Sequence, residues 1–216
     1  MTTSRDYFQH DRKEMLRFLP STYSKVLEIG CGDGNFLMQL RGANESWGVE
    51  PDKNSAEIAS QKLTKVFVAR YDQIAEKIPN DYFDLIICND VIEHMNDHDW
   101  FFDSIRTKLR SSGSLVASLP NVRYVRNLFE MLVLKDWRYQ DSGILDRTHL
   151  RFFTKKSILR TLNEHGLLVE EIRGIKWGNS LLNRIVFASI SVLSLGFYSD
   201  VQYPQFGIRV RKRQSH

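Results

Sequence analysis

Short apolar runs alternate with amphipathic segments from Lys25 to Pro120. The runs predict strands near residues 25–30, 46–50, 65–69, 83–88 and 113–118, and the segments between them predict helices near 34–41, 54–62, 72–77 and 97–110. Apolar strands without polar alternation are typical of a parallel sheet that helices cover on both faces. The pattern therefore predicts an α/β fold with a doubly wound sheet.

The regular alternation of predicted strands and helices ends after Pro120. Residues 121–150 read as an insertion, a helix capped by Thr154 is predicted over 154–164, and two more strands are predicted near 167–174 and 203–212. Asp97, or Asn96 before it, is expected to cap the earlier helix near 97–110. Polar and apolar residues alternate in the last strand, which indicates a strand that is half exposed or at a sheet edge.

Two further segments carry amphipathic or apolar patterns. Residues 7–19 predict a short helix that ends before Pro20. Residues 181–198 are apolar, but their unbroken part is shorter than the ~20 residues that a membrane-spanning helix needs. This segment is expected to form a helix that packs on the domain or on a second subunit of a homodimer; the alternative is a helix that lies on a membrane surface.

Composition narrows the class of protein. A chain of 216 residues with 42% hydrophobic and 26% charged residues fits a single globular domain over 1–216. The net charge of +4 is too small to indicate a nucleic-acid partner, although basic residues gather in the tail at 209–213. Residues 1–15 contain no apolar signal-peptide core, so we expect a cytoplasmic protein, with attachment to the inner face of the membrane as the alternative.

A glycine-rich turn follows the first predicted strand. Its glycines are Gly30, Gly32 and Gly34, and Asn35 stands where a dinucleotide-binding turn would carry its third glycine. Glycine lets the backbone pass close to a ligand where a Cβ atom would collide. Gly30, Cys31, Gly32 and Gly34 are therefore candidate ligand contacts, and the spacing argues against a dinucleotide.

Two acidic residues identify the ligand more closely. Glu50 ends the second predicted strand, where its carboxylate can accept hydrogen bonds from both hydroxyls of a ribose. Glu28 lies inside the first strand, where it would repel a diphosphate and suit a cationic amino group. S-adenosylmethionine carries a ribose, an ammonium group and a sulfonium group without phosphate, and it is the predicted cofactor.

From about Lys25 to Ile175 the chain resembles the class I S-adenosylmethionine-dependent methyltransferases. The resemblance rests on the glycine turn, on the fourth-strand segment Phe83–His94 and on the fifth-strand segment Ser112–Asn121. The segment Gly143–Thr154 is similar to a bacterial branch associated with cell-surface polysaccharide and sugar pathways.

The resemblance implies a Rossmann-like sheet of seven strands, mostly parallel, in which the last strand is antiparallel and inserted. It also implies that Asp72 meets the adenine amino group and that Asn89 and Asp90 line the methionine end of the pocket. The insertion at 121–150 would form a lid over the site.

Methyl transfer to a hydroxyl needs a base within hydrogen-bonding reach. His149, at the end of the insertion, is the first candidate, and the alternative is that its imidazole only pins the lid. His94, after the fourth strand, is the second, with an architectural role as its alternative. His94, His98 and Asp99 lack convincing metal-ligand spacing, so no metal site is expected.

The insertion supplies candidate acceptor contacts. Arginine side chains suit phosphate or carboxylate groups, and aromatic rings can stack on a sugar. The candidates are Arg123, Tyr124, Arg126, Trp137, Tyr139 and Arg151. The alternative is that the aromatic residues only pack the lid onto the core.

Together these features predict an enzyme that methylates an oxygen of a small molecule or glycan. The alternatives are a quinone, lipid or RNA acceptor, and an inactive S-adenosylmethionine-binding scaffold.

Overall fold

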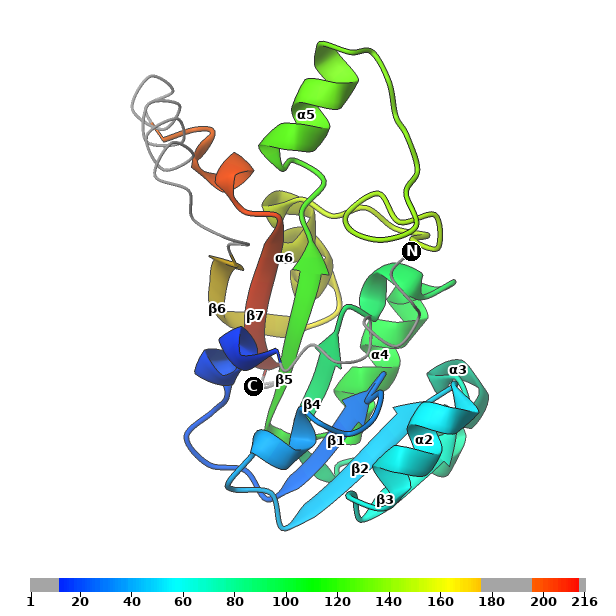
Figure 1. The fold of residues 1–216 in the computed structure, drawn as a ribbon. Helices are drawn as coiled ribbons and strands as arrows, with labels where there is room; N and C mark the ends of the chain where they lie inside the picture. Colours follow the sequence, from blue (N-terminus) through cyan, green and yellow to red (C-terminus); the bar gives the residue numbers. More distant parts are fainter. Residues whose placement is uncertain (1–11, 176–195, 214–216) are drawn as a thin grey trace.

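The computed structural model describes residues 12–175 and 196–213 of the chain (Figure 1). The strands are β1 Lys25–Ile29, β2 Glu45–Glu50, β3 Lys65–Val68, β4 Phe83–Asn89, β5 Leu109–Pro120, β6 Leu167–Ile175 and β7 Gln205–Lys212. The α-helices are α2 Lys53–Ser60, α3 Tyr71–Ile74, α4 His98–Lys108, α5 Val125–Leu132 and α6 Lys155–Glu164. Short 3-10 helices are η1 Lys13–Phe18, η2 Leu37–Gln39, η3 Ala75–Lys77, η4 Ile92–His94 and η5 Ser199–Gln202.

The strands form one seven-stranded sheet in the order β3-β2-β1-β4-β5-β7-β6. The pairs from β3 to β5 are parallel, whereas β7 runs antiparallel to both β5 and β6. This topology confirms the predicted doubly wound sheet with an inserted antiparallel strand.

The interpretation of β7 as an edge strand was wrong, because β6 occupies the edge. Arg209 shows why polar residues alternate in an interior strand: its guanidinium lies 3.0 Å from the Glu170 carboxylate of β6 and donates to the Leu19 carbonyl at 3.2 Å. Neighbouring elements thus satisfy the polar positions of β7.

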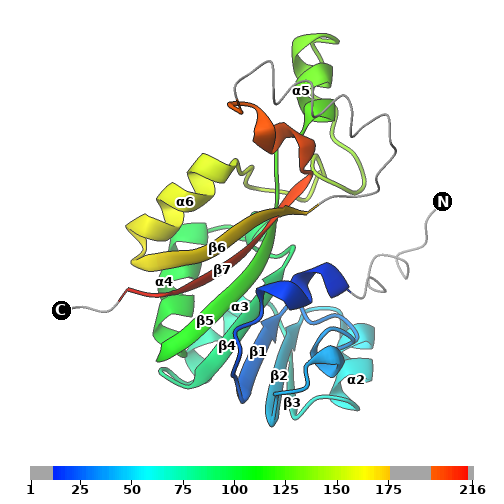
Figure 2. The ribbon, with the colours of Figure 1, turned by 90° about the vertical axis from the view of Figure 1, so that its left-hand side faces the viewer.

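Two apolar layers cover the two faces of the sheet (Figure 2). One layer joins α3, α4 and α6 to the sheet through buried residues such as Tyr71, Phe101 and Ile158. The other joins η1, η2 and α2, with Met15 and Phe18 fully buried. Because successive strand residues point to opposite faces, both faces of β4 must be apolar, which explains its unbroken apolar run.

The helix predicted over 7–19 extends outside the described residues. Its described part is the 3-10 helix η1, which ends at Phe18, and Leu19 is extended before Pro20. The Phe18 ring lies against Gly207 of β7, where an added Cβ atom would stand 2.3 Å from the ring. This contact fastens the N-terminal segment across the sheet.

The helix predicted over 34–41 was wrong. Only η2 forms there, between Gly34, which has a φ of +76°, and Leu40, which is extended. The left-handed backbone of Gly34 and the extended backbone of Leu40 leave room between them for only a short helical turn. The predicted caps of the later helices are confirmed: Asp97 accepts from Trp100 N at 2.9 Å and Thr154 from Ser157 N at 3.1 Å.

The insertion leaves the sheet after β5 and returns beside it. Val122 N donates to the Phe153 carbonyl at 2.9 Å, so the two ends of the insertion meet. Between them, α5 stands beyond the carboxyl ends of the strands (Figure 1). Its apolar side is exposed rather than packed, with Leu132 at 68% exposure and Phe129 at 52%.

Residues 181–195 of the predicted apolar helix lie outside the described residues, and residues 196–198 form a turn. Within the described part of the chain, no helix has the length and apolarity to cross a bilayer.

Candidate active site

The glycine turn joins β1 to η2 at the carboxyl edge of the sheet. Gly30, Gly32 and Gly34 all have positive φ, at 73°, 51° and 76°. A Cβ atom on Gly30 would lie 2.6 Å from Val91 Cγ2, so glycine is required there for conformation and for space. The turn brings bare backbone to the ends of β1, β2 and β4.

Glu50 is buried at the end of β2 and faces this turn. Its Oε2 accepts from Gly32 N at 2.9 Å and its Oε1 accepts from Asp52 N at 2.9 Å. Each oxygen keeps a second lone pair, so the carboxylate can still accept from a pair of ribose hydroxyls. Burial raises the pKa of Glu50, and the two backbone donors oppose that rise.

Glu28 and Asn89 bring unsatisfied polar atoms to the neighbouring strands β1 and β4. Glu28 Oε2 and both polar atoms of the Asn89 amide are buried, and none has a partner within hydrogen-bonding distance in the part of the chain that the structure describes, although Asn89 lies near enough to Glu28 to lower the pKa of that carboxyl. Burial raises the pKa of Glu28, and the nearby Glu50 carboxylate raises it further. Buried polar groups are normally paired, so these atoms indicate a polar ligand. A cationic ammonium group beside Glu28 meets that requirement, and the site therefore fits S-adenosylmethionine.

Asp90 follows Asn89 and is held by three elements. It has a left-handed φ of 54°, a conformation that is strained for a non-glycine residue. Its Oδ1 accepts from Ser118 Oγ at 2.8 Å and from Gln205 Nε2 at 2.6 Å. Arg12 forms an ion pair with the same carboxylate, which brings the segment before η1 to the edge of the site.

The other predicted cofactor contacts lie at the same edge. Cys31 is buried, and burial raises the pKa of its thiol, so the thiol stays protonated. Asp72 is exposed in α3 and forms an ion pair with Arg70 at 3.3 Å. Its contact with adenine stays a prediction.

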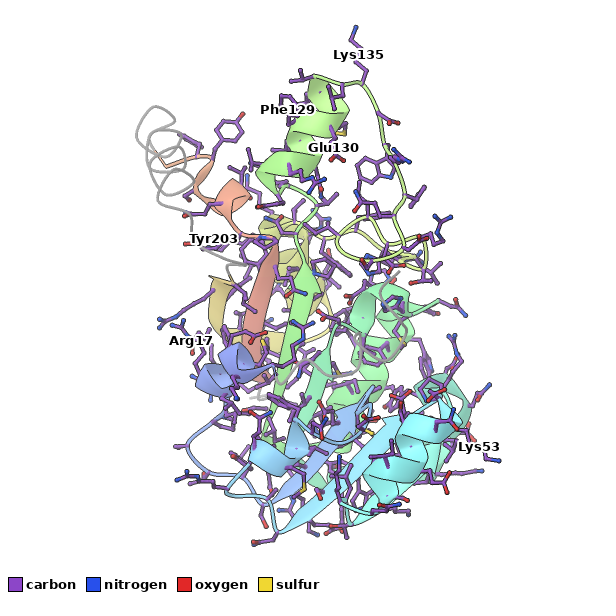
Figure 3. The ribbon with its side chains drawn as sticks, in the orientation of Figure 1. Arg17, Lys53, Phe129, Glu130, Lys135 and Tyr203 are labelled. Carbon is purple, nitrogen blue, oxygen red and sulfur yellow. The ribbon has the colours of Figure 1, made fainter. Side chains whose placement is uncertain are left out.

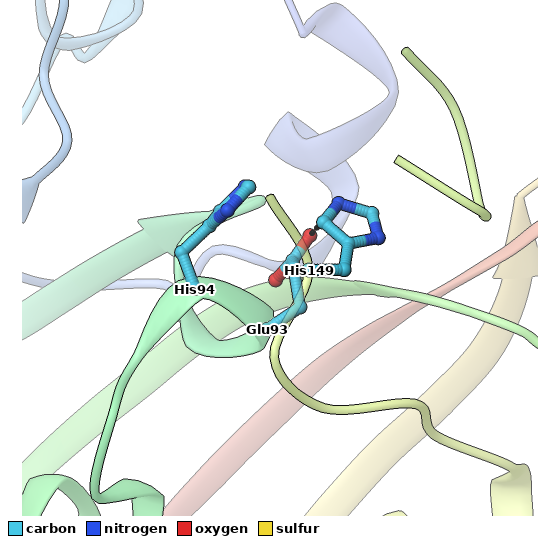
Figure 4. A group of neighbouring side chains, drawn as sticks. All are labelled: Glu93, His94 and His149. Atoms are coloured by element: carbon cyan, nitrogen blue, oxygen red, sulfur yellow. Dashed lines mark ion pairs between the residues drawn. The ribbon is translucent and has the colours of Figure 1, made fainter. Parts of the chain in front are cut away.

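Glu93, His94 and His149 form a compact group next to this pocket (Figure 4). Glu93 and His94 belong to η4, directly after β4, whereas His149 comes from the loop before α6. The rings of His94 and His149 meet edge to face with centroids 4.8 Å apart, and His149 Nε2 lies 4.0 Å from Glu93 Oε1. The structure thus brings together the two histidines that the sequence had selected.

Burial favours the uncharged forms of Glu93 and His94. Burial raises the pKa of Glu93 to about 8. Burial and the adjacent His149 lower the pKa of His94, so its imidazole is uncharged at neutral pH. An uncharged imidazole can accept a proton or bind a cation.

The segment 146–149 positions these histidines through a tight turn. The Asp146 carboxylate accepts from Thr148 N at 2.8 Å and from Thr148 Oγ1 at 2.6 Å. The Thr148 carbonyl lies 3.2 Å from His94 Nδ1, and the Glu93 carbonyl accepts from Leu150 N at 2.8 Å. The turn therefore locks η4 and the end of the insertion together.

Sequence reasoning missed Glu93 as a member of this group. The signal was present, because Glu93 precedes His94 directly and both follow a buried strand. Neighbours in a helical turn usually point in different directions, so only the structure shows that both reach His149.

The predicted acceptor contacts are engaged within the protein. Arg123 binds the Asp200 carboxylate through two nitrogens, at 2.9 and 3.3 Å, and lies over the Tyr198 ring. Arg126 pairs with Glu130 at 3.1 Å, and Arg151 donates to the Asn96 carbonyl at 2.9 Å.

The aromatic candidates gather around one side chain. The Trp137 ring meets the Phe152 ring edge to face at 5.3 Å, and Tyr139 lies 6.5 Å from the same ring. Tyr124 is half buried and precedes α5 as its N-cap residue. Their role toward an acceptor stays a prediction.

Comparison with known families agrees with this geometry. Residues 5–172 match the family described as methyltransferase domain. The chain therefore belongs to the methyltransferase domain family. Its fold matches an S-adenosylmethionine-dependent methyltransferase from Archaeoglobus fulgidus with a TM-score of 0.64 at 18% identity, covering 97% of this chain and 95% of that one. A putative methyltransferase of the same kind from Listeria monocytogenes gives a TM-score of 0.65 at 17% identity, with 94% and 98% covered.

Two relatives in sequence carry more specific names. One is a trans-aconitate 2-methyltransferase from Rhizobium rhizogenes, 25% identical over 68% of this chain and 56% of that protein. The other is a ubiquinone biosynthesis O-methyltransferase from Aeromonas salmonicida, 26% identical over 71% of this chain and 66% of that protein. The chain spans less than two thirds of the length of each relative.

Proposed function

We propose that the protein transfers the methyl group of S-adenosylmethionine to an oxygen of a small hydroxylated molecule, with a sugar or glycan as the first choice. The observation that carries this proposal is the adjacency of two sets of groups. The unsatisfied atoms of Glu28 and Asn89 lie on the neighbouring strands β1 and β4, and His94 follows β4 in η4, where its ring meets the ring of His149.

The protein's part in such a reaction is alignment and proton removal. The Glu50 carboxylate and the glycine turn hold the nucleoside, and Glu28 with Asn89 holds the amino-acid end. The bound cofactor supplies a methyl group on a cationic sulfur, which is already a good leaving group. The acceptor hydroxyl loses its proton at the His94 and His149 group, where His149 is the first candidate.

The test is calorimetric titration with S-adenosylhomocysteine, followed by an acceptor screen that measures methyl transfer. We expect His149→Ala to bind S-adenosylhomocysteine like the wild type and to lose on the order of 10²–10⁴-fold in turnover. His165→Gln is the matched control, because that imidazole follows α6 and pairs with Asp99 and Asp103 of α4. Undiminished turnover in His149→Ala would leave His149 as a pin of the insertion. Failure to bind S-adenosylhomocysteine would sink the proposal, and turnover with any acceptor would sink an inactive scaffold.

A second candidate acceptor is a lipophilic molecule, such as a quinone or a lipid-linked sugar. It is favoured by the exposed apolar side of α5, which carries Phe129 (Figure 3). Phe197 and Tyr198 add to this surface, at 82% and 50% exposure. Such a surface would place the protein at the inner face of a membrane. Co-sedimentation with anionic vesicles tests this, and Leu132→Ser should weaken any binding. Equal sedimentation of wild type and variant would argue against the surface.

A further inference from the structure

Three side chains at the end of β4 present metal-binding atoms to one another. One donor atom each from Glu93, His94 and His149 lies within 4.8 Å of the other two. Donor atoms around a zinc ion lie about 3–3.5 Å apart, given bond lengths of about 2.0–2.2 Å. Small side-chain rotations would therefore close this group around an ion.

Hydrogen bonds set both imidazoles in the form that binds metals. His149 Nδ1 lies 3.0 Å from the Ile144 carbonyl, and His94 Nδ1 lies 3.2 Å from the Thr148 carbonyl. A carbonyl can only accept, so each Nδ1 carries a proton, and Nε2 is the nitrogen that remains available to bind a metal ion. Histidine ligands of metals typically donate their second N–H to a carbonyl or carboxylate in this way.

Glu93, the third residue of the group, has one carboxylate oxygen without a hydrogen-bond partner among the described residues. Glu93 is 1% exposed, and the oxygen without a partner is its Oε2. Leaving a buried carboxyl oxygen unpaired costs free energy that a bound cation would recover. This orphaned oxygen is an observation independent of the histidine geometry, and it points to the same centre.

We propose that Glu93, His94 and His149 bind a divalent transition-metal ion, with zinc as the best match. Two imidazoles and one carboxylate suit zinc, and three protein ligands leave a position open for a substrate. This replaces the expectation of no metal site, which weighed His94 with His98 and Asp99. The turn at 146–149 would then orient a metal ligand, because Asp146 holds Thr148 and the Thr148 carbonyl lies against His94 Nδ1.

The use of the ion in catalysis rests on the proposed methyl transfer. An acceptor hydroxyl bound at the open position is acidified and releases its proton to solvent. Its oxygen then forms a bond to the methyl carbon while the carbon–sulfur bond breaks, and S-adenosylhomocysteine leaves. In this arrangement the imidazoles are ligands, and the metal removes the need for a protein base.

The test is metal uptake, which needs no acceptor. Cobalt(II) replaces zinc and absorbs visible light, so titration of metal-free wild type with Co²⁺ should show about one ion per chain. Glu93→Gln should weaken that uptake by roughly tenfold or more. His165→Gln, which alters a half-buried imidazole beside the carboxylates of Asp99 and Asp103, should leave the uptake unchanged. S-adenosylhomocysteine binding by the same variants reports whether they are folded, and the half-buried His94→Gln replaces Glu93→Gln if the latter does not fold.

The outcomes separate the two proposals. Wild type that binds S-adenosylhomocysteine but neither cobalt nor zinc overturns the metal site and leaves methyl transfer standing. Cobalt uptake that survives both Glu93→Gln and His94→Gln also overturns it. Stoichiometric uptake that requires Glu93, without S-adenosylhomocysteine binding, supports the metal site and defeats the proposed methyl transfer.

Discussion

The cofactor end and the acceptor end of the site differ in how firmly contacts within the protein hold their side chains. At the cofactor end, Glu50 is buried and both of its oxygens are held by backbone donors of the glycine turn and of the segment before α2. At the acceptor end, α5 presents its apolar side to solvent, with Leu132 and Phe129 exposed. The cofactor end gains rigidity from the sheet itself. The insertion touches the sheet mainly at its two ends, so α5 needs a partner to bury its apolar side.

Two glycines with positive φ, Gly30 at the cofactor end and Gly143 at the acceptor end, separate the effect of packing from that of backbone strain. Gly30→Ala would place a Cβ atom 2.6 Å from Val91, whereas Gly143 of the insertion has nothing within 4 Å of the added atom. We expect Gly30→Ala to lower the free energy of unfolding by about 2–5 kcal/mol, from backbone strain plus overpacking. Gly143→Ala should cost only the strain, about 1–2 kcal/mol. Urea denaturation of both variants measures this, and equal losses would contradict the difference in packing.

Glu50 and Glu45, at the two ends of β2, test which carboxylate binds the cofactor. Glu50→Ala should weaken S-adenosylhomocysteine binding by about 1–3 kcal/mol, because the buried partners of the carboxylate are left unpaired. Glu45 is the matched control at the opposite end of the strand, where it accepts from Trp47 Nε1 at 2.6 Å and from Tyr82 OH at 2.9 Å. Glu45→Ala should cost stability and spare affinity in calorimetry. Loss of affinity in both variants would place the ribose elsewhere.

The smallest expected change in the free energy of unfolding is at Leu132 in α5, and Leu162 in α6 is its buried counterpart. Leu132 in α5 is 68% exposed, whereas Leu162 in α6 is 0% exposed. Leu162→Ala should cost about 2–5 kcal/mol in the free energy of unfolding. Leu132→Ala should stay within about 0.5 kcal/mol. A large loss in Leu132→Ala would show that the apolar side of α5 is packed in solution, for instance against a second copy of the chain.

Local chemistry was sufficient for most of the fold. The unbroken apolar runs predicted the parallel strands, and Asp97 and Thr154 marked their helices, because these signals act over a few residues. The helix over 34–41 failed because the pattern does not show that Gly34 is left-handed and Leu40 is extended. The inserted place of β7, which the resemblance implied, is confirmed, but the exposure inferred from its polar alternation was wrong. The partners of Arg209 come from β6 and from the segment after η1, which are distant in sequence.

In the site, too, residues close together in the sequence could be predicted and contacts between distant residues could not. The glycine turn, Glu28 and Glu50 share one βαβ unit, so their spacing was informative. The group at Glu93 joins η4 to a loop more than fifty residues away, since His149 lies in the segment that returns from the insertion. Arg123, predicted to contact the acceptor, forms an ion pair with Asp200 instead. The sequence could not predict this pair, because it does not show which distant carboxylate will lie near the arginine.

The position of β7 has a consequence for synthesis of the protein. β6 pairs with β7 and β7 pairs with β5, so β6 has no place in the sheet until residues 205–212 have left the ribosome. Until then, the nascent chain exposes the free edge of β5 with its apolar residues Leu115 and Ala117, a template for unwanted pairing. The cofactor-binding half can assemble earlier during translation, and the last strand closes the sheet. Ribosome pausing before residues 205–212 have emerged should therefore increase the demand for chaperones, whereas a delay after they have emerged should not.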